Sequence, residues 1–370
     1  MAPSFENIGN ELFNFVVREG NGVKGMVDSG ITTVPDQYIQ SPQERIVKQG
    51  IDPSYPPSLV SPIDLSELEG PNHDQVVELL GQSAETLGFF QVINHGVQVE
   101  LLEQLKDAAH RFFNQPPERK AFVYLKGASP SPFVKYGTSF VPEAEKALEW
   151  KDYISMTYSG DEDALNFWPE ECKEVALEYL KSSTKMVKRI LEVLLRRLGV
   201  TVDHTETEAY IGTRMVNMNL VSKSELTVGV GRHSDMGILT VLLQDGIGGL
   251  YVKVEDDRLG RKKGEWVEIP PTPGALVVNV GDTLEILSNG RYKSAEHRVW
   301  TTNAESRVSI PVFVFPLPTK KIKPLPQVVE KDGVAHYGEF LFEEYMKNFF
   351  GKGHEGKKSL DFVKITMSPS

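Results

Sequence analysis

The sequence has few cysteines, no long hydrophobic run and no excess of positive charge. Cys172 is the single cysteine among 370 residues, which excludes an internal disulfide framework and is typical of a reducing compartment. No stretch approaches the roughly 18 uninterrupted apolar residues of a membrane helix. Residues 1–15 lack the basic segment and the apolar core of a signal peptide. We therefore expect a cytoplasmic protein without a membrane partner.

The charge balance also excludes a general class of partners. The chain carries 40 Lys and Arg against 51 Asp and Glu, which gives a net charge of −11. An acidic surface argues against nucleic acid as a partner, although it permits a local basic pocket. With 40% hydrophobic and 25% charged residues, the composition is that of an ordinary globular protein. We expect a monomer that binds no nucleic acid.

The periodicity of apolar residues changes along the chain. The first half has helical periodicity over residues 74–87, 101–113 and 171–198, and a short strand is predicted at 89–93. The second half has strand-like runs at 239–243, 275–280 and 308–314, separated by glycine turns. A helix is predicted again within 337–350. Many short strands are typical of a sandwich or barrel, of which the double-sheet jelly roll is one form.

Two histidines and one aspartate form the candidate metal site. His233 and Asp235 are two residues apart, and in an extended strand both side chains would project to the same face. A third ligand must then come from another strand, and His297 follows a turn that leads into one. Two His and one carboxylate leave coordination positions open, which is the geometry of non-haem Fe(II) oxygenases.

A second pair of residues, one with a cationic side chain and one with a hydroxyl group, follows this site. Arg307 and Ser309 are again two residues apart, on the strand predicted after His297. The guanidinium fork grips a carboxylate in two places and the serine adds a hydroxyl group. The pair would bind the far carboxylate of a dicarboxylic oxo-acid whose other end chelates iron. Phe313 has the same parity, so it should face the same cavity and could stack on a flat substrate.

These motifs resemble those of the plant 2-oxoglutarate/Fe(II)-dependent dioxygenase family, and the resemblance covers nearly the whole chain. The matching stretches are residues 88–96, His233-Ser234-Asp235, His297 and Arg307-Val308-Ser309; residues 14–25, 135–140, 149–153 and 229–235 are similar to its coumarin-forming branch. The resemblance implies a mixed α/β, β-rich fold: a double-stranded β-helix (jelly-roll) core with packed N-terminal helices and a C-terminal helix. We expect an N-terminal helical region (1–205), the jelly-roll core (206–320) and a C-terminal helical closure (321–370).

The resemblance also implies a reaction and its participants. Fe(II) is the cofactor, 2-oxoglutarate and O2 are co-substrates, and ascorbate is the expected reductant. The reaction is hydroxylation of a small aromatic substrate in coumarin (phenylpropanoid) biosynthesis. The substrate is either a coumarin, scopoletin giving fraxetin, or a hydroxycinnamoyl-CoA, feruloyl-CoA or p-coumaroyl-CoA giving scopoletin or umbelliferone. The implied residues are His233, Asp235 and His297 for the metal, Arg307, Ser309 and Asn219 for 2-oxoglutarate, and Phe313, Lys135 and Tyr136 for the substrate pocket.

The chain departs from the family pattern after Asn219. The family continues from the matching asparagine with two tyrosines, a proline and a Cys-Pro pair, whereas this chain continues with Leu220-Val221-Ser222 and is about three residues shorter. The tyrosines normally help to line the oxo-acid pocket. The departure leaves open a second class of function, a binding protein that keeps the fold but has lost turnover. A jelly-roll protein that uses another metal for non-oxidative chemistry is a third class, but it leaves Arg307 and Ser309 unexplained.

Overall fold

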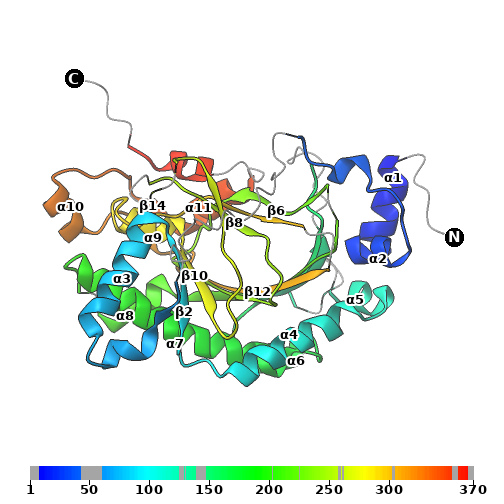
Figure 1. The fold of residues 1–370 in the computed structure, drawn as a ribbon, viewed down its shortest axis with the longest axis horizontal. Helices are drawn as coiled ribbons and strands as arrows, with labels where there is room; N and C mark the ends of the chain where they lie inside the picture. Colours follow the sequence, from blue (N-terminus) through cyan, green and yellow to red (C-terminus); the bar gives the residue numbers. More distant parts are fainter. Residues whose placement is uncertain are drawn as a thin grey trace.

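The structure, a computed structural model, contains two facing sheets, with helices along one side of the pair and at both ends (Figure 1). It describes residues 8–42, 61–124, 129, 131–138, 147–201, 203–224, 226–256, 260, 262–301, 305–351 and 357–365. Among the described helices, none combines the length and apolar character needed to span a membrane.

The larger sheet has eight strands. Their order is β1-β2-β10-β7-β12-β5-β4-β3, and every pairing except that of β1 with β2 is antiparallel. The strands are β1 (Ile63–Asp64), β2 (Phe89–Ile93), β10 (Leu276–Val280), β7 (Leu239–Gln244), β12 (Arg307–Phe315), β5 (Thr213–Val221), β4 (Lys151–Thr157) and β3 (Val134–Thr138). The sequence pattern located β2, β7, β10 and β12 but not β3 and β4, so the first half of the chain is less purely helical than predicted.

The smaller sheet covers one face of the larger one. It has the order β6-β11-β8-β9, from β6 (Val228–His233), β11 (His297–Trp300), β8 (Leu250–Lys253) and β9 (Trp266–Glu268). Val277 and Val221 of the large sheet pack with Leu250, Val252 and Val299 of the small sheet in one apolar cluster. The two sheets therefore face each other, as in the predicted jelly roll.

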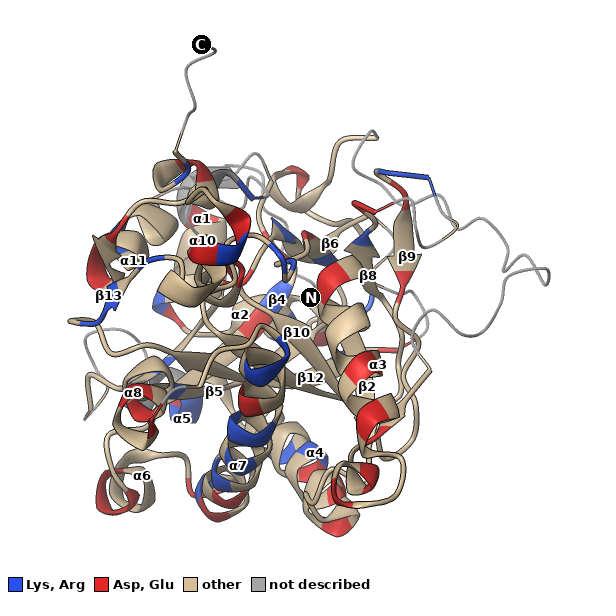
Figure 2. Cartoon of the chain, turned by 90° about the vertical axis from the view of Figure 1, so that its left-hand side faces the viewer, with Lys and Arg blue, Asp and Glu red and all other residues tan. Residues whose placement is uncertain are grey.

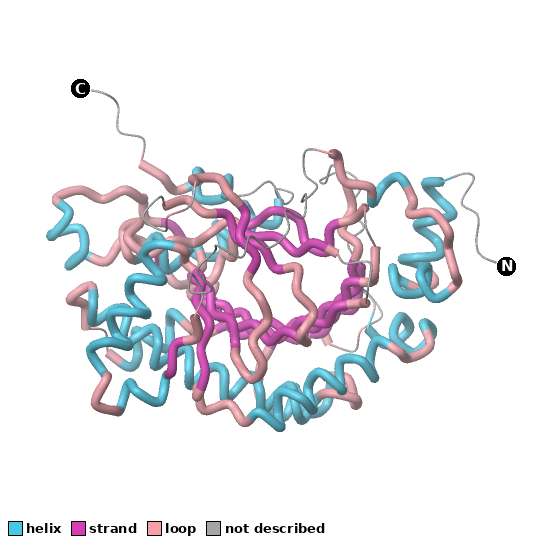
Figure 3. The backbone as a smooth tube through the Cα atoms, in the orientation of Figure 1, coloured by secondary structure: helices cyan, strands magenta, loops and turns pink. Residues whose placement is uncertain are grey.

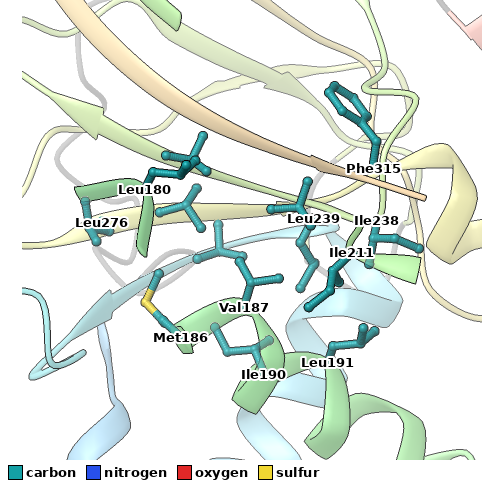
Figure 4. Packing of buried hydrophobic residues seen from close by; sticks show 14 of the residues in the cluster. Leu180, Met186, Val187, Ile190, Leu191, Ile211, Ile238, Leu239, Leu276 and Phe315 are labelled. Carbon is teal, nitrogen blue, oxygen red and sulfur yellow. The ribbon is translucent and has the colours of Figure 1, made fainter. Parts of the chain in front are cut away.

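Helices cover the outer face of the large sheet (Figure 3). The longest are α3 (His73–Thr86), α4 (Val99–Phe113) and α7 (Lys173–Arg197), which agree closely with the predicted ranges. Val187 and Ile190 of α7 meet Leu239 of β7 and Leu276 of β10 in the main hydrophobic core (Figure 4). Because side chains alternate along a strand, burying this face against helices turns the other set of side chains toward the small sheet.

The opposite side of α7 carries Lys and Arg (Figure 2). The sequence predicts a solvated charged face here. The structure adds ion pairs to neighbouring segments, since Arg197 lies 3.1 Å from Glu78 of α3 and Lys188 pairs with Glu208 of α8 (His204–Tyr210). Exposed pairs of this kind contribute little to stability.

The two ends of the chain pack on the sheets from different sides. α1 (Ile8–Phe13), the π-helix Asn14–Arg18 and α2 (Gly22–Asp28) lie beside β4, where the buried carboxylate of Asp152 accepts hydrogen bonds from two backbone N–H groups of α2. The C-terminal part contains α10 (Pro326–Asp332), the short pair β13 (Lys321–Ile322) and β14 (Phe340–Leu341), α11 (Phe342–Gly351) and a 3-10 helix (Lys357–Phe362). Shorter connecting helices are α5 (Pro117–Tyr124), α6 (Asp161–Phe167), α9 (Asp282–Leu287), and the 3-10 helices Asp36–Tyr38 and Leu65–Glu69.

Candidate metal centre

The structure brings His233, Asp235 and His297 together. His233 is the last residue of β6 and His297 the first of β11, and the two are direct partners across the antiparallel pair. One ligand atom from each of the three residues lies within 4.8 Å of the others. One detail differs from the sequence expectation. β6 ends at His233, so Asp235 is placed by the connection to β7 and not by alternation along a strand.

Backbone carbonyl groups orient both imidazole rings. His233 Nδ1 lies 2.8 Å from the carbonyl oxygen of Gly231, and His297 Nδ1 lies 3.1 Å from that of Ala295. In the tautomer that donates from Nδ1, the lone pair of Nε2 points to the centre of the cluster. The two Nε2 atoms lie 3.5 and 3.7 Å from the same atom, Asp235 Oδ1. Phe89 packs edge-on against His297, with ring centroids 5.1 Å apart.

Asp235 is held by neutral donors on its other oxygen. Its Oδ2 accepts hydrogen bonds from Thr240 Oγ1 at 2.6 Å and from Asn279 Nδ2 at 2.8 Å. Burial raises the pKa of this carboxyl group, but the two histidines and the hydrogen bond from Asn279 lower it more, so the pKa lies well below its usual range. The group is therefore an ionised carboxylate with one oxygen fixed and the other directed at the histidines. This donor set suits Fe(II).

We expect Thr240 to support metal binding through this hydrogen bond. Thr240→Val keeps the shape of the side chain but removes the donor to Asp235 Oδ2. Loss of such a supporting contact should weaken Fe(II) or Mn(II) binding by about 10- to 100-fold, measured by anaerobic metal titration. Thr184→Val is the matched control, because Thr184 is similarly buried and its hydrogen bond within the described part of the chain goes to the Leu180 carbonyl of its own helix. Equal metal affinity in the two variants would contradict the role of Thr240.

The predicted oxo-acid residues lie together on the inner face of the large sheet. Ser309 of β12 is the direct partner of Asn219 on β5 and of Gln244 on β7. Arg307 is 2% exposed; its Nη2 donates to Gln244 Oε1 at 2.9 Å and its Nε to the Ile247 carbonyl at 3.3 Å. Its Nη1 is buried and has no partner among the described residues. A buried guanidinium with one unsatisfied donor fits a ligand carboxylate.

Burying the positive charge of Arg307 at this position is energetically unfavourable. Burial lowers its pKa to about 10, although the carboxylates of Asp245 and Glu268 oppose that shift. A buried cation is stabilised when an anion enters and completes its hydrogen bonds. The pocket therefore favours a dianionic ligand such as 2-oxoglutarate beside the metal.

The residues that depart from the family pattern after Asn219 lie at the end of β5, opposite Arg307. Val221, two residues after Asn219, is the cross-strand partner of Arg307. Its side chain belongs to the apolar cluster between the sheets. The second of the two positions at which the family pattern has tyrosines is thus occupied here by a hydrocarbon side chain, on the residue that pairs with Arg307.

The three predicted substrate residues do not all face the site. Phe313 lies on the inner face and stacks on Phe315, with ring centroids 5.9 Å apart. Lys135 has inner-face parity on the edge strand β3 and is exposed. Tyr136 points the opposite way and packs in the helix-facing core, 6.0 Å from the ring of Phe112. Neighbours in one strand point to opposite faces, so the structure separates Tyr136 from Lys135 and Phe313.

Several residues near the site were missed by sequence reasoning. Thr240, Gln244 and Asn279 are ordinary polar residues within strands, and only their alternation with the apolar residues of β7 and β10 could have placed them on the inner face. Asp282 lies behind the metal motif: its backbone N–H donates to the carbonyl oxygen of Asp235 at 2.6 Å, and its carboxylate accepts hydrogen bonds from Ser234 and Tyr345. This last contact connects the C-terminal helix α11 to the metal motif.

A jelly roll that holds two histidines and one carboxylate beside a buried arginine defines a non-haem iron oxygenase that uses an oxo-acid. Two family profiles match the chain, the 2OG-Fe(II) oxygenase superfamily over residues 211–316 and the non-haem dioxygenase N-terminal region over residues 60–171. The chain is 60% identical to scopoletin 8-hydroxylase of Arabidopsis thaliana over 98% of its own length and 99% of that protein. It is 46% identical to a feruloyl CoA ortho-hydroxylase of Ipomoea batatas over 99% and 100%. The chain belongs to the 2OG-Fe(II) oxygenase superfamily and is a 2-oxoglutarate-dependent dioxygenase.

Solved structures agree with this assignment. The crystal structure of JOX2 in complex with 2OG, Fe and JA superposes with a TM-score of 0.77 at 29% identity, covering 93% of this chain and 97% of that one. The rice dioxygenase for auxin oxidation superposes with a TM-score of 0.67 at 25% identity, covering 83% and 100%. The predicted fold class and the predicted cofactors, Fe(II) with 2-oxoglutarate and O2, are confirmed.

Proposed function

We propose that this enzyme hydroxylates scopoletin at carbon 8 to give fraxetin. The observation that carries the proposal is the 60% identity to scopoletin 8-hydroxylase over nearly the full length of both chains, against 46% for a feruloyl CoA ortho-hydroxylase. The complete donor set of His233, Asp235 and His297 supports it.

In this proposal each residue has a defined role. His233, Asp235 and His297 hold Fe(II), which when bound supplies the oxidation that couples loss of carbon dioxide from 2-oxoglutarate to hydroxylation of an aromatic carbon. The Arg307 fork and the Ser309 hydroxyl group bind the distal carboxylate of 2-oxoglutarate, with Asn219 beside them. Phe313 offers a flat apolar surface to the aromatic ring.

The distribution of cations supports a free coumarin over a CoA thioester. On the inner face of the large sheet, the described cations are Arg307, Lys151 and Lys135. Arg307 is deeply buried and Lys151 lies 2.8 Å from Glu149, so among the described residues of this face Lys135 is the exposed cation. The several phosphates of coenzyme A call for a cluster of cationic donors. An uncharged coumarin needs an apolar slot with a few polar groups.

The test is a paired assay. Protein loaded with Fe(II) and ascorbate under anaerobic conditions receives 2-oxoglutarate and either scopoletin or feruloyl-CoA, followed by air. We expect succinate and fraxetin in equal amounts with scopoletin, and much less succinate with feruloyl-CoA. A preference for feruloyl-CoA would establish the second candidate, ortho-hydroxylation of that thioester.

The Val221 substitution gives this assay a third informative outcome. With Val221 opposite Arg307 in place of a tyrosine, the chain could bind a coumarin without consuming 2-oxoglutarate. Succinate no higher than in a His233→Ala variant, together with measurable binding of scopoletin, would replace the proposed enzyme by a binding protein on the same fold.

A further inference from the structure

Asn217 occupies a distinctive position on the inner face of the large sheet. It lies on β5 two residues before Asn219 and two residues after Met215. Asn219 is the partner of Ser309, and Met215 is the partner of Phe313. Residues two apart in a strand share a face and are about 6.5 Å apart. Asn217 therefore lies between the Asn219–Ser309 pair, which belongs to the oxo-acid site, and the Met215–Phe313 pair.

On this face of the sheet, the strands on one side of Asn217 approach the metal motif, and those on the other side end at the exposed edge strand β3. Phe313 is the partner of Thr240, which holds Asp235. The backbones of β5 and β7 are separated by β12 alone, a distance of about 10 Å. On the other side, Ser155 of β4 is the partner of Asn217, and the exposed Lys135 is the partner of Ser155.

The amide oxygen of Asn217 lacks a donor. Asn217 Oδ1 is buried and accepts no hydrogen bond from the described residues. A buried acceptor without a donor is unfavourable, so a ligand that brings a donor to Asn217 Oδ1 would be stabilised at this position. 2-Oxoglutarate cannot supply one, because its two carboxylates and keto group are all acceptors at neutral pH. A hydroxyl group on the other ligand of the pocket can supply this donor.

We propose that Asn217 recognises the phenolic hydroxyl group of the aromatic substrate. This inference rests on the proposed function, and it makes Asn217 a specificity-determining residue within it. Scopoletin carries one free hydroxyl group, on carbon 7, directly beside the carbon that is hydroxylated. With the ring against Phe313 and this hydroxyl group donating to Asn217 Oδ1, the neighbouring carbon is held in the part of the pocket that lies toward the metal motif. The contact thus selects both the substrate and the position that reacts.

The experiment compares scopoletin with its 7-methyl ether, which has no donor. Binding is measured by equilibrium dialysis to protein loaded anaerobically with Fe(II) and 2-oxoglutarate, so that no turnover occurs. Wild type should bind scopoletin about tenfold more tightly than the ether, the effect of one well-formed hydrogen bond. In Asn217→Leu, which is similar in size but has no acceptor, the two affinities should agree within about twofold. The affinity for 2-oxoglutarate should be unchanged.

Two further variants make the result decisive. Asn217→Asp keeps an acceptor oxygen and should keep the preference for the hydroxyl compound, even if Asn217→Leu fails to fold. Asn114→Leu, at an exposed position after α4, controls for the change of composition. If wild type hydroxylates scopoletin but Asn217→Leu still prefers it over the ether, this inference is wrong while the proposed function stands. If wild type neither binds nor hydroxylates scopoletin, both are wrong.

Discussion

Replacing His233 with alanine is expected to abolish metal binding and turnover together. His233 and His297 direct their Nε2 atoms at one oxygen of Asp235, and the loss of one of three protein ligands leaves two that cannot hold the ion in a facial arrangement. The effect should exceed the roughly 10- to 100-fold loss expected for residues that only support a ligand. Metal content after anaerobic loading and gel filtration, and succinate formation, measure the two consequences separately.

The control for this variant is His204→Ala. His204 is exposed on α8, and its only described contact is with Glu208 at 3.7 Å. The control should retain the full metal content and activity. If His233→Ala protein kept stoichiometric iron and formed succinate at the rate of the control, the assignment of the metal site would have to be abandoned.

The second large effect is expected from Arg307→Met. Arg307 is buried and already bound to Gln244 and the Ile247 carbonyl group, so its remaining Nη1 donor is fixed in direction before the ligand enters. Truncating one partner of a buried charged pair costs about 2–5 kcal/mol, which corresponds to about 30- to 5,000-fold weaker binding of 2-oxoglutarate. The Kd of the iron-loaded protein for 2-oxoglutarate measures the loss, and the affinity for scopoletin should change little.

A co-substrate without the distal carboxylate shows whether Arg307 acts through that group. Wild type should strongly prefer 2-oxoglutarate to 2-oxobutyrate, and Arg307→Met should lose most of this preference. Arg196→Met, at an exposed position of α7, should behave as wild type. A variant that still discriminated fully between the two oxo-acids would show that another group binds the distal carboxylate.

The departure after Asn219 bears on the same pocket. The hydrocarbon of Val221 stands opposite Arg307, so the guanidinium fork and Ser309 carry more of the recognition than they would beside a tyrosine. This increases the effect expected for Arg307→Met. For the same reason, the affinity for 2-oxoglutarate is a sensitive test of whether this protein catalyses substrate turnover.

Local pattern determined much of the architecture. The apolar periodicity of residues 171–198 specified α7, and the change of period between residues 74–87 and 89–93 separated α3 from β2. Helix and strand impose different periods on the residues they bury. The i, i+2 spacing of Arg307 and Ser309 was sufficient to place both on one face of a strand. The strands β3 and β4 were missed, since their inner face is polar and their outer face lies under helices that the local pattern does not reveal.

The sequence by itself determined the kind of chemistry, because the ligand types of His233, Asp235, His297 and Arg307 are fixed by their side chains. Only the tertiary structure decided which residues act together. Asp235 reaches the histidines through a connection beyond the end of β6. Tyr136 turns into the helix-facing core, whereas Lys135 lies on the inner face of the sheet. Thr240, Gln244 and Asn279 join the site from strands that carry no motif. The physical reason is that spacing along a strand fixes the face of each side chain, whereas the distances between side chains on different strands depend on strand pairing, which joins residues far apart in the sequence.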